Sequence, residues 1–168
     1  PGLIGSLPKE LCQIHSLRRL CICRCGLTGP IPPEIGLLTG LEELQLFGNN
    51  FTGSIPSSLG NLINLKLLSL GEYTGGNNFT PEPIPFCISR LVQLEALFLA
   101  NCNISGVIPR WIGELRELRQ LDLQRNNLTG SIPPTIGKLE NLLYLNVKDN
   151  HALGGKLPLL ELLSLSKL

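Results

Sequence analysis

The chain repeats one leucine-headed segment at a fixed interval, and this period constrains the fold more than any other feature. The step from Leu17 to Leu41 equals the steps from Leu94 to Leu118 and from Leu118 to Leu142. Aligned on these leucines, the units share their apolar, Gly and Pro positions, as LEELQLFGNNFTGSIPSSLGNLIN and LRQLDLQRNNLTGSIPPTIGKLEN show. A period of about 20 to 50 residues indicates an array in which each unit packs on its neighbours. The sequence therefore predicts one solenoid.

The repeat boundaries assign the whole chain, 1–168, to a single domain. Its units are a partial repeat at 1–16, repeats at 17–40, 41–64, 65–93, 94–117 and 118–141, and a final repeat at 142–168. Neither end carries a capping sequence, and the last residues, LLELLSLSKL, end where another unit would begin. We expect a segment of a longer array, whose uncapped ends would contact neighbouring repeats or self-associate.

Two columns of the repeat define the path of each coil. In LEELQLFGNN, Leu44 and Leu46 alternate with Gln45 and Phe47, which predicts a short half-buried strand. The ninth column holds Asn, with Cys in two units, and an inward amide there would bond the backbone of the bend. The members of this column are Asn49, Asn126 and Asn150, with Cys25 and Cys102. The GSIP-type motifs that follow supply a bend and a fixed φ before a 3₁₀ or irregular turn.

The predicted fold is an α/β solenoid, a right-handed curved array with a concave parallel β-sheet and 3₁₀ or irregular turns on the convex side. The repeat pattern LxxLxLxxNxLxGxIPxxLGxLxx resembles the plant-type leucine-rich repeats, and it covers essentially the whole chain. The resemblance implies an array like those of receptor-like kinase and receptor-like protein ectodomains and of polygalacturonase-inhibiting proteins. It also implies a recognition surface, without naming the ligand.

Charge and motifs argue against several classes of function. The 14 basic and 13 acidic residues give a net charge of +1 without a run of like charge, so we expect neither nucleic acid nor a membrane as a partner. Two histidines, scattered carboxylates and the lack of a phosphate-binding or nucleophile motif predict no enzyme activity and no cofactor. Cys21 and Cys23 are expected on the concave side as free thiols, because a metal site would need further ligands nearby.

We predict a protein or peptide ligand on the concave face. Aromatic and aliphatic side chains occupy the outward strand positions of the middle units, with charged groups at both ends. The repeat at 65–93 is longer than the others, because GEYTGG is inserted between the strand and Asn77 and PEPIP replaces GSIP, so a loop is expected beside the concave sheet. The predicted ligand-binding residues are Gln45, Phe47, Leu67, Ser69, Tyr73, Phe98, Asp122 and Tyr144.

Four N-x-S/T sequons follow the ninth column and predict glycans on one flank if the chain is secreted. Their acceptors are Asn50, Asn78, Asn103 and Asn127. We expect an extracellular or cell-surface location, with a cytoplasmic one as the alternative that free thiols would favour. Two other functions remain open: inhibition of a secreted hydrolase, and a structural or ice-binding array. The second rests on a hydroxyl ladder of Thr28, Thr52, Thr80, Ser105 and Thr129.

Overall fold

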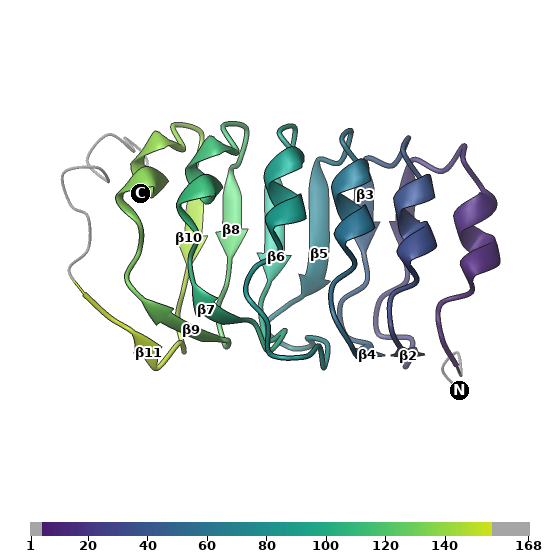
Figure 1. The fold of residues 1–168 in the computed structure, drawn as a ribbon, viewed down its shortest axis with the longest axis horizontal. Helices are drawn as coiled ribbons and strands as arrows, with labels where there is room; N and C mark the ends of the chain where they lie inside the picture. The colour runs from purple at the N-terminus through teal and green to yellow at the C-terminus, as the bar shows by residue number, and fades with distance from the viewer. Residues whose placement is uncertain (1–4, 156–168) are drawn as a thin grey trace.

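The computed structural model describes residues 5–155 and shows a curved stack of coils with one strand and one short helix in each complete coil (Figure 1). Six strands form a parallel sheet in the order β1-β3-β5-β6-β8-β10. They are β1 (Arg19–Cys21), β3 (Glu43–Gln45), β5 (Leu67–Gly71), β6 (Ala96–Leu99), β8 (Gln120–Asp122) and β10 (Tyr144–Asn146). The solenoid with a parallel sheet that the repeat predicts is confirmed.

The sheet register follows the repeat. Leu20 pairs with Leu44, Leu44 with Leu68, and Leu97 with Leu121, each one regular repeat apart. Leu68 pairs with Leu97 across the longer repeat, and the register shifts between Ser69 and Gly71. The inserted residues therefore do not alter the pairing of Leu67, Leu68 and Ser69, and they are accommodated at the end of β5.

Short 3₁₀ helices line the opposite side of the coils. They are η1 (Lys9–Gln13), η2 (Pro33–Leu37), η3 (Ser57–Asn61), η4 (Phe86–Arg90), η5 (Arg110–Glu114) and η6 (Pro134–Lys138). Each begins directly after a proline whose φ lies between −63° and −74°, and the proline carbonyl accepts from the N–H three residues on, as Pro109 does from Ile112 at 3.1 Å.

A glycine in these helices lets adjacent coils approach closely. A Cβ on Gly113 would overlap the backbone carbonyl of Thr135 in the next coil. The glycine of the repeat is a packing requirement here, because any side chain at this position would force the coils apart.

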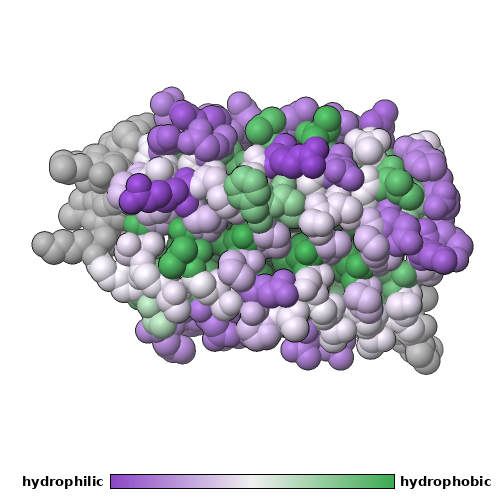
Figure 2. Space-filling view, in the orientation of Figure 1, coloured by the Kyte–Doolittle hydropathy of each residue, from purple (hydrophilic) through white to green (hydrophobic). Residues whose placement is uncertain are grey.

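The core is the leucine and isoleucine ladder between the sheet and the helices. Leu44, Leu68, Leu97 and Leu121 are fully buried, one per coil. Figure 2 shows the face turned toward the viewer in Figure 1, where apolar side chains form a broken band along the array among polar ones. The hydrophobic effect therefore acts along the whole length of the stack.

The asparagines of the ninth column point inward, as predicted. Asn126 is buried, and its Oδ1 accepts from the N–H groups of Cys102 at 3.1 Å and Ile104 at 2.9 Å. Its Nδ2 donates to the carbonyls of Leu99 at 2.8 Å and Leu123 at 3.0 Å. Each such side chain joins two consecutive bends of the backbone.

Short strands after the bends form two further parallel sheets, which the sequence did not predict. One contains β2 (Thr28–Gly29) and β4 (Asn50–Phe51), and the other contains β7 (Ser105–Val107), β9 (Asn127–Gly130) and β11 (Ala152–Leu153). They are separated by residues 78–83, which form no strand and include the first three residues of PEPIP, the sequence that takes the place of GSIP. The predicted uncapped ends, 1–4 and 156–168, lie outside the described residues.

Candidate functional site

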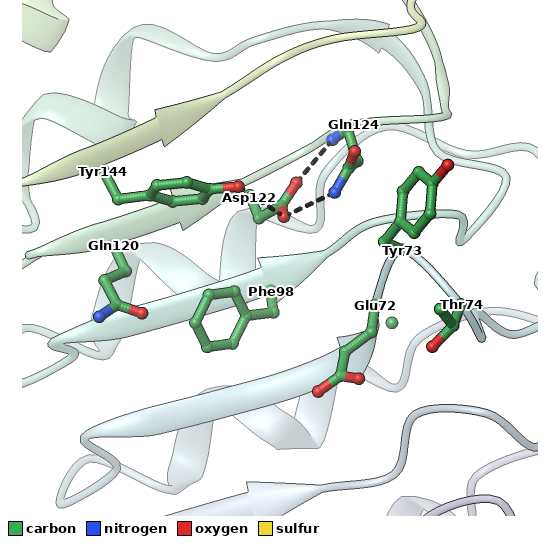
Figure 3. A pocket seen from close by; sticks show the side chains of 9 residues that line it. Glu72, Tyr73, Thr74, Phe98, Gln120, Asp122, Gln124 and Tyr144 are labelled. Carbon is green, nitrogen blue, oxygen red and sulfur yellow. Dashed lines mark hydrogen bonds between the residues drawn. The ribbon is translucent and has the colours of Figure 1, made fainter.

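The inserted residues 71–76 form a tight hairpin at the end of β5 (Figure 3). The Glu72 N–H donates to the Gly75 carbonyl at 3.0 Å, and the Gly75 N–H donates back to Glu72 at 3.2 Å. Tyr73 and Thr74 occupy the exposed turn. A Cβ on Gly76 would overlap the Asn101 carbonyl, so only glycine allows the hairpin to return to the next coil at this position. The loop lies beside the concave sheet, as the sequence predicts.

Two arginines fasten the hairpin from opposite sides. Arg24 Nη2 donates to Thr74 Oγ1 at 2.6 Å and lies 3.4 Å from a carboxylate oxygen of Glu72. The Arg125 guanidinium lies over the Tyr73 ring, 4.2 Å from its centroid, and donates to the Tyr73 hydroxyl at 3.3 Å. Exposed ion pairs and cation–π contacts each contribute only about 1 kcal/mol or less. Their joint effect is to fix where the hairpin lies.

The hairpin turns an open part of the sheet into a cavity of about 470 Å³. Its other walls come from β6, β8 and β10. The lining residues are Gly71, Glu72, Tyr73, Thr74, Phe98, Gln120, Asp122, Gln124 and Tyr144. In Figure 3, Phe98 and Asp122 lie between Tyr144 on one side and Tyr73 on the other. The concave sheet therefore carries a hollow in this half of the array, beside the insertion that the sequence singles out.

Asp122 lies in the wall of the cavity and is 7% exposed. Its carboxylate accepts from the Gln124 N–H at 3.0 Å, from Gln124 Nε2 at 2.9 Å and from the Tyr144 hydroxyl at 3.5 Å. Asn146 Nδ2 donates in turn to the Tyr144 oxygen at 2.9 Å. These bonds hold the carboxylate in one orientation between β8 and β10.

Half of the predicted ligand-binding residues come together in this cavity. Tyr73, Phe98, Asp122 and Tyr144 line it, whereas Gln45, Phe47, Leu67 and Ser69 do not. Sequence reasoning omitted Glu72 and Thr74, although both lie in the insertion that it singled out. The partners Arg24 and Arg125 share one repeat column, and this shared column was the available signal.

The other four predicted residues lie on β3 and β5 or, for Phe47, just after β3. The half-buried Phe47 ring lies under the Arg24 guanidinium at 5.5 Å, and the half-buried Leu67 borders a separate depression among charged side chains. Ser69 is only 2% exposed, and its Oγ is the one buried side-chain polar atom without a hydrogen-bond partner among residues 5–155.

The alternation of side chains along the strands did not predict which of the outward-facing residues are buried. Five residues at outward positions of the strands are nevertheless buried: Ser69, Ala96, Ala100, Asp122 and Gln124. Asp122 and Gln124 line the hollow and are hydrogen-bonded to each other. The exposed surface predicted from the sequence is therefore too large at these positions.

The sequon asparagines lie on one flank but differ in their environment. Asn50, Asn78 and Asn127 are exposed, while Asn103 is half-buried and donates through Nδ2 to the Phe79 carbonyl at 2.9 Å. Asn127 Nδ2 donates to Asn103 Oδ1 at 2.8 Å. The amide nitrogens of Asn103 and Asn127 are thus already engaged in hydrogen bonds.

All six cysteines are free thiols in the structure. Cys21 and Cys23 lie on the concave side with their sulfurs 3.4 Å apart, and Cys25, expected in the interior, is half-buried. Burial, with a smaller effect of the Cys21 hydrogen bond, raises the pKa of Cys23 to about 12. Among residues 5–155, no group of three or more His, Cys, Asp or Glu side chains is placed to hold a metal ion.

Comparison with known proteins decides the family. Leucine-rich repeat models match residues 16–38, 40–62 and 92–152, which together cover more than half of the chain. The chain belongs to the leucine-rich repeat family. It is of the plant type, because the structural matches include ectodomains of Arabidopsis receptor kinases with the same repeat geometry.

Two of these receptor structures illustrate the match. The ectodomain of Arabidopsis thaliana GASSHO1/SCHENGEN3, solved in complex with CASPARIAN STRIP INTEGRITY FACTOR 2, shares 36% identity over 98% of this chain, with a TM-score of 0.88. Arabidopsis HAESA, solved in complex with the peptide hormone IDA and the co-receptor SERK1, shares 39% identity over 94% of the chain, with a TM-score of 0.86. The chain spans 19% and 26% of these two proteins' lengths.

A plant ice-binding protein also matches, with 28% identity over 88% of this chain and 45% of its own, and a TM-score of 0.77. No curated protein sequence matches the chain. No helix within residues 5–155 has the length and apolar character needed to cross a membrane.

Proposed function

We propose that this chain is part of an extracellular receptor-like ectodomain that binds a peptide or a protein segment on its concave face, without catalysis. The observation that carries the proposal is the cavity between the hairpin and β6, β8 and β10. It combines partly exposed aromatic rings with hydrogen-bonding groups, which is the anatomy of a recognition pocket. The HAESA and GASSHO1/SCHENGEN3 ectodomains, each solved with a bound partner, support a ligand of this kind.

The binding surface is expected to extend beyond the cavity. Gln45, Phe47 and Leu67 lie on β3 and β5 or directly after β3, beside the hairpin, so an extended peptide crossing the strands would contact them as well. The flank with the sequons carries a hollow of about 640 Å³, but asparagine and charged side chains line it instead of Phe or Tyr rings. The exposed sequons are proposed glycan sites, with Asn103 less accessible because its Nδ2 is hydrogen-bonded.

The test is a peptide-display selection on the secreted chain, followed by affinity measurements on variants. Replacing Tyr73, Phe98 and Tyr144 together by Ala should weaken binding of selected peptides at least tenfold, because exposed aromatics in a partner's contact contribute strongly. A second variant, with Phe47 and Leu67 replaced by Ala, measures the contribution of the neighbouring strands. Phe86, 72% exposed on η4, provides the control Phe86→Ala.

Equal binding by the triple variant and by Phe86→Ala would place the site elsewhere. Stronger loss in the Phe47 and Leu67 variant than in the triple variant would move the centre of the site to β3 and β5.

A second candidate, ice binding, is favoured only by the hydroxyl ladder and by the ice-binding structural match. A flat, regular face is needed for that function, and the coil at 78–83 interrupts the two short sheets that carry the ladder. An ice recrystallisation assay on the secreted chain tests it directly. The other alternative, hydrolase inhibition, is a form of protein binding and would use the same concave surface.

A further inference from the structure

We propose that the hairpin cavity accepts a cationic group of the ligand, either a Lys or Arg side chain or a peptide N-terminal ammonium. This inference rests on the proposed function and specifies the ligand's chemistry at one point. It follows from the charge balance of the cavity, from its aromatic walls and from the way both neighbouring arginines are already engaged.

The first observation is the charge balance. Two of the nine lining residues, Glu72 and Asp122, carry negative charge, and none of them is Lys, Arg or His. Glu72 is paired with Arg24 at 3.4 Å. Asp122 forms no salt bridge with any residue among 5–155, and its hydrogen bonds come from neutral donors. One buried negative charge in the wall is therefore left without a counter-ion.

The second observation is that the two arginines holding the hairpin already have other partners. The Arg125 guanidinium lies on the Tyr73 ring and is 3.5 Å from a carboxylate oxygen of Asp149. Arg24 is held by Thr74 and Glu72 on the other side of the hairpin. Both would have to abandon these partners to reach Asp122, so the missing positive charge would come from a ligand.

The third observation is the shape of the walls. Phe98 lies beside Asp122, with Tyr144 and Tyr73 on either side (Figure 3). Aromatic faces carry partial negative charge and attract ammonium and guanidinium groups, while their area packs against the methylene stem of Lys or Arg. Carbonyl oxygens of Gln120 and Gln124 can accept hydrogen bonds from the same group.

Other ligand groups fit less well. A carboxylate or sulfate would meet Asp122 with like charge in a partly enclosed site. An uncharged aliphatic side chain would displace water from the carboxylate without replacing its hydrogen bonds. A cation compensates the charge of Asp122 and also donates hydrogen bonds to its carboxylate oxygens.

The experiment titrates the intact chain with five small probes and follows the ring resonances of Tyr73, Phe98 and Tyr144 by NMR. Nα-acetyl-lysinamide and Nα-acetyl-argininamide represent the two side chains, and leucinamide represents a free ammonium terminus. Nα-acetyl-norleucinamide and Nα-acetyl-glutamate amide are the uncharged and anionic controls. We expect at least one cationic probe to bind at least tenfold more tightly than the norleucine probe, and the strongest cationic probe identifies the source of the charge.

Three variants locate the effect. Asp122→Asn removes the charge with little change of shape and should abolish the cationic preference. Glu95→Gln removes an exposed carboxylate that is paired with Arg119 at 3.5 Å outside the cavity, and it should leave the preference intact. Tyr144→Phe removes one hydrogen bond to Asp122 but keeps the charge and the ring, so binding of cations should persist even if Asp122→Asn folds poorly.

Equal affinity for the lysine and norleucine probes, or a cationic preference that survives Asp122→Asn, would overturn the inference. Loss of the preference in Tyr144→Phe, with the fold intact, would also overturn it, because charge would then not be the decisive factor. The display selection is an independent readout: peptides that bind the cavity without a basic group refute only this inference, whereas the failure of all peptides refutes the proposed function.

Discussion

Replacing Asn126 by Leu is the sharpest test of the inward asparagine column. The side chain is buried, and its Oδ1 accepts from two backbone N–H groups, those of Cys102 and Ile104. Leucine has a similar size but no acceptor, so both N–H groups would be left without a partner inside the array. Each unsatisfied buried donor costs about 1 to 3 kcal/mol, which gives a loss of about 2 to 6 kcal/mol in the free energy of unfolding.

The assay is equilibrium unfolding in urea of unglycosylated protein. With a slope of about 2 kcal/mol per M, a loss of about 4 kcal/mol lowers the midpoint by about 2 M. The matched control is Asn127→Leu, the same substitution one residue further on, where the exposed side chain bonds only the Asn103 side chain. We expect the control to change the free energy of unfolding by about 0.5 kcal/mol or less. Equal midpoints for the two variants would refute the bridging role of Asn126.

Contacts between coils and at the hairpin lead to three further predictions. Gly113→Ala should destabilise the array by about 1 to 3 kcal/mol in thermal unfolding, because the new Cβ would overlap the Thr135 carbonyl. The control Gly154→Ala should be nearly neutral, because the space around its Cβ is open. Arg125→Ala should speed hydrogen exchange of the Gly75 N–H by releasing Tyr73, with global stability changed by about 1 kcal/mol or less; an unchanged exchange rate would show that Arg125 does not hold the hairpin. Desolvation raises the pKa of the half-buried Cys23 thiol and of the buried Cys102 thiol to about 12, so both stay protonated at pH 8 and should react slowly with iodoacetamide, with rates that rise as the pH approaches 12. Rapid labelling of either at pH 8, read by mass spectrometry, would contradict the desolvation of that thiol.

The parts of the structure that repeat were predictable from the sequence because each column is written several times. The leucine columns predicted the strands, the prolines of the IP pairs predicted the start of the 3₁₀ helices from η2 to η6, and the ninth column predicted the inward asparagines. Each prediction uses one physical rule that holds in coil after coil. The rules are the alternation of side chains along a strand, the fixed φ of proline, and the cost of an unpaired buried amide. Where one unit departs from the pattern, the same column in the other units still indicates the structure.

The parts that occur once were less predictable. The position of the insertion followed from the repeat, but its hairpin is held by Arg24 and Arg125, which lie in repeats near opposite ends of the array. The two arginines share a repeat column, but the repeat does not show that both contact the hairpin, since these contacts depend on the distance across several coils. The burial of Ser69 and Asp122 has the same origin, because it depends on which neighbours cover them rather than on the side to which the backbone directs them.

The hairpin explains how a repeat surface can acquire a specific site. A parallel sheet of near-identical coils offers the same shallow face at every step, and a ligand could slide along it with little change in contact. An insertion in one coil ends this equivalence. Here it adds a wall, sets Tyr73 across from Phe98 and Tyr144, and forms one side of the hollow that Asp122 lines. Because interactions with a buried charge are strengthened when water is excluded, the same carboxylate would discriminate weakly on the open sheet and more strongly beneath the hairpin. The specificity of this array is therefore expected to depend on the hairpin and on the two arginines that hold it, more than on the repeated columns that build the fold.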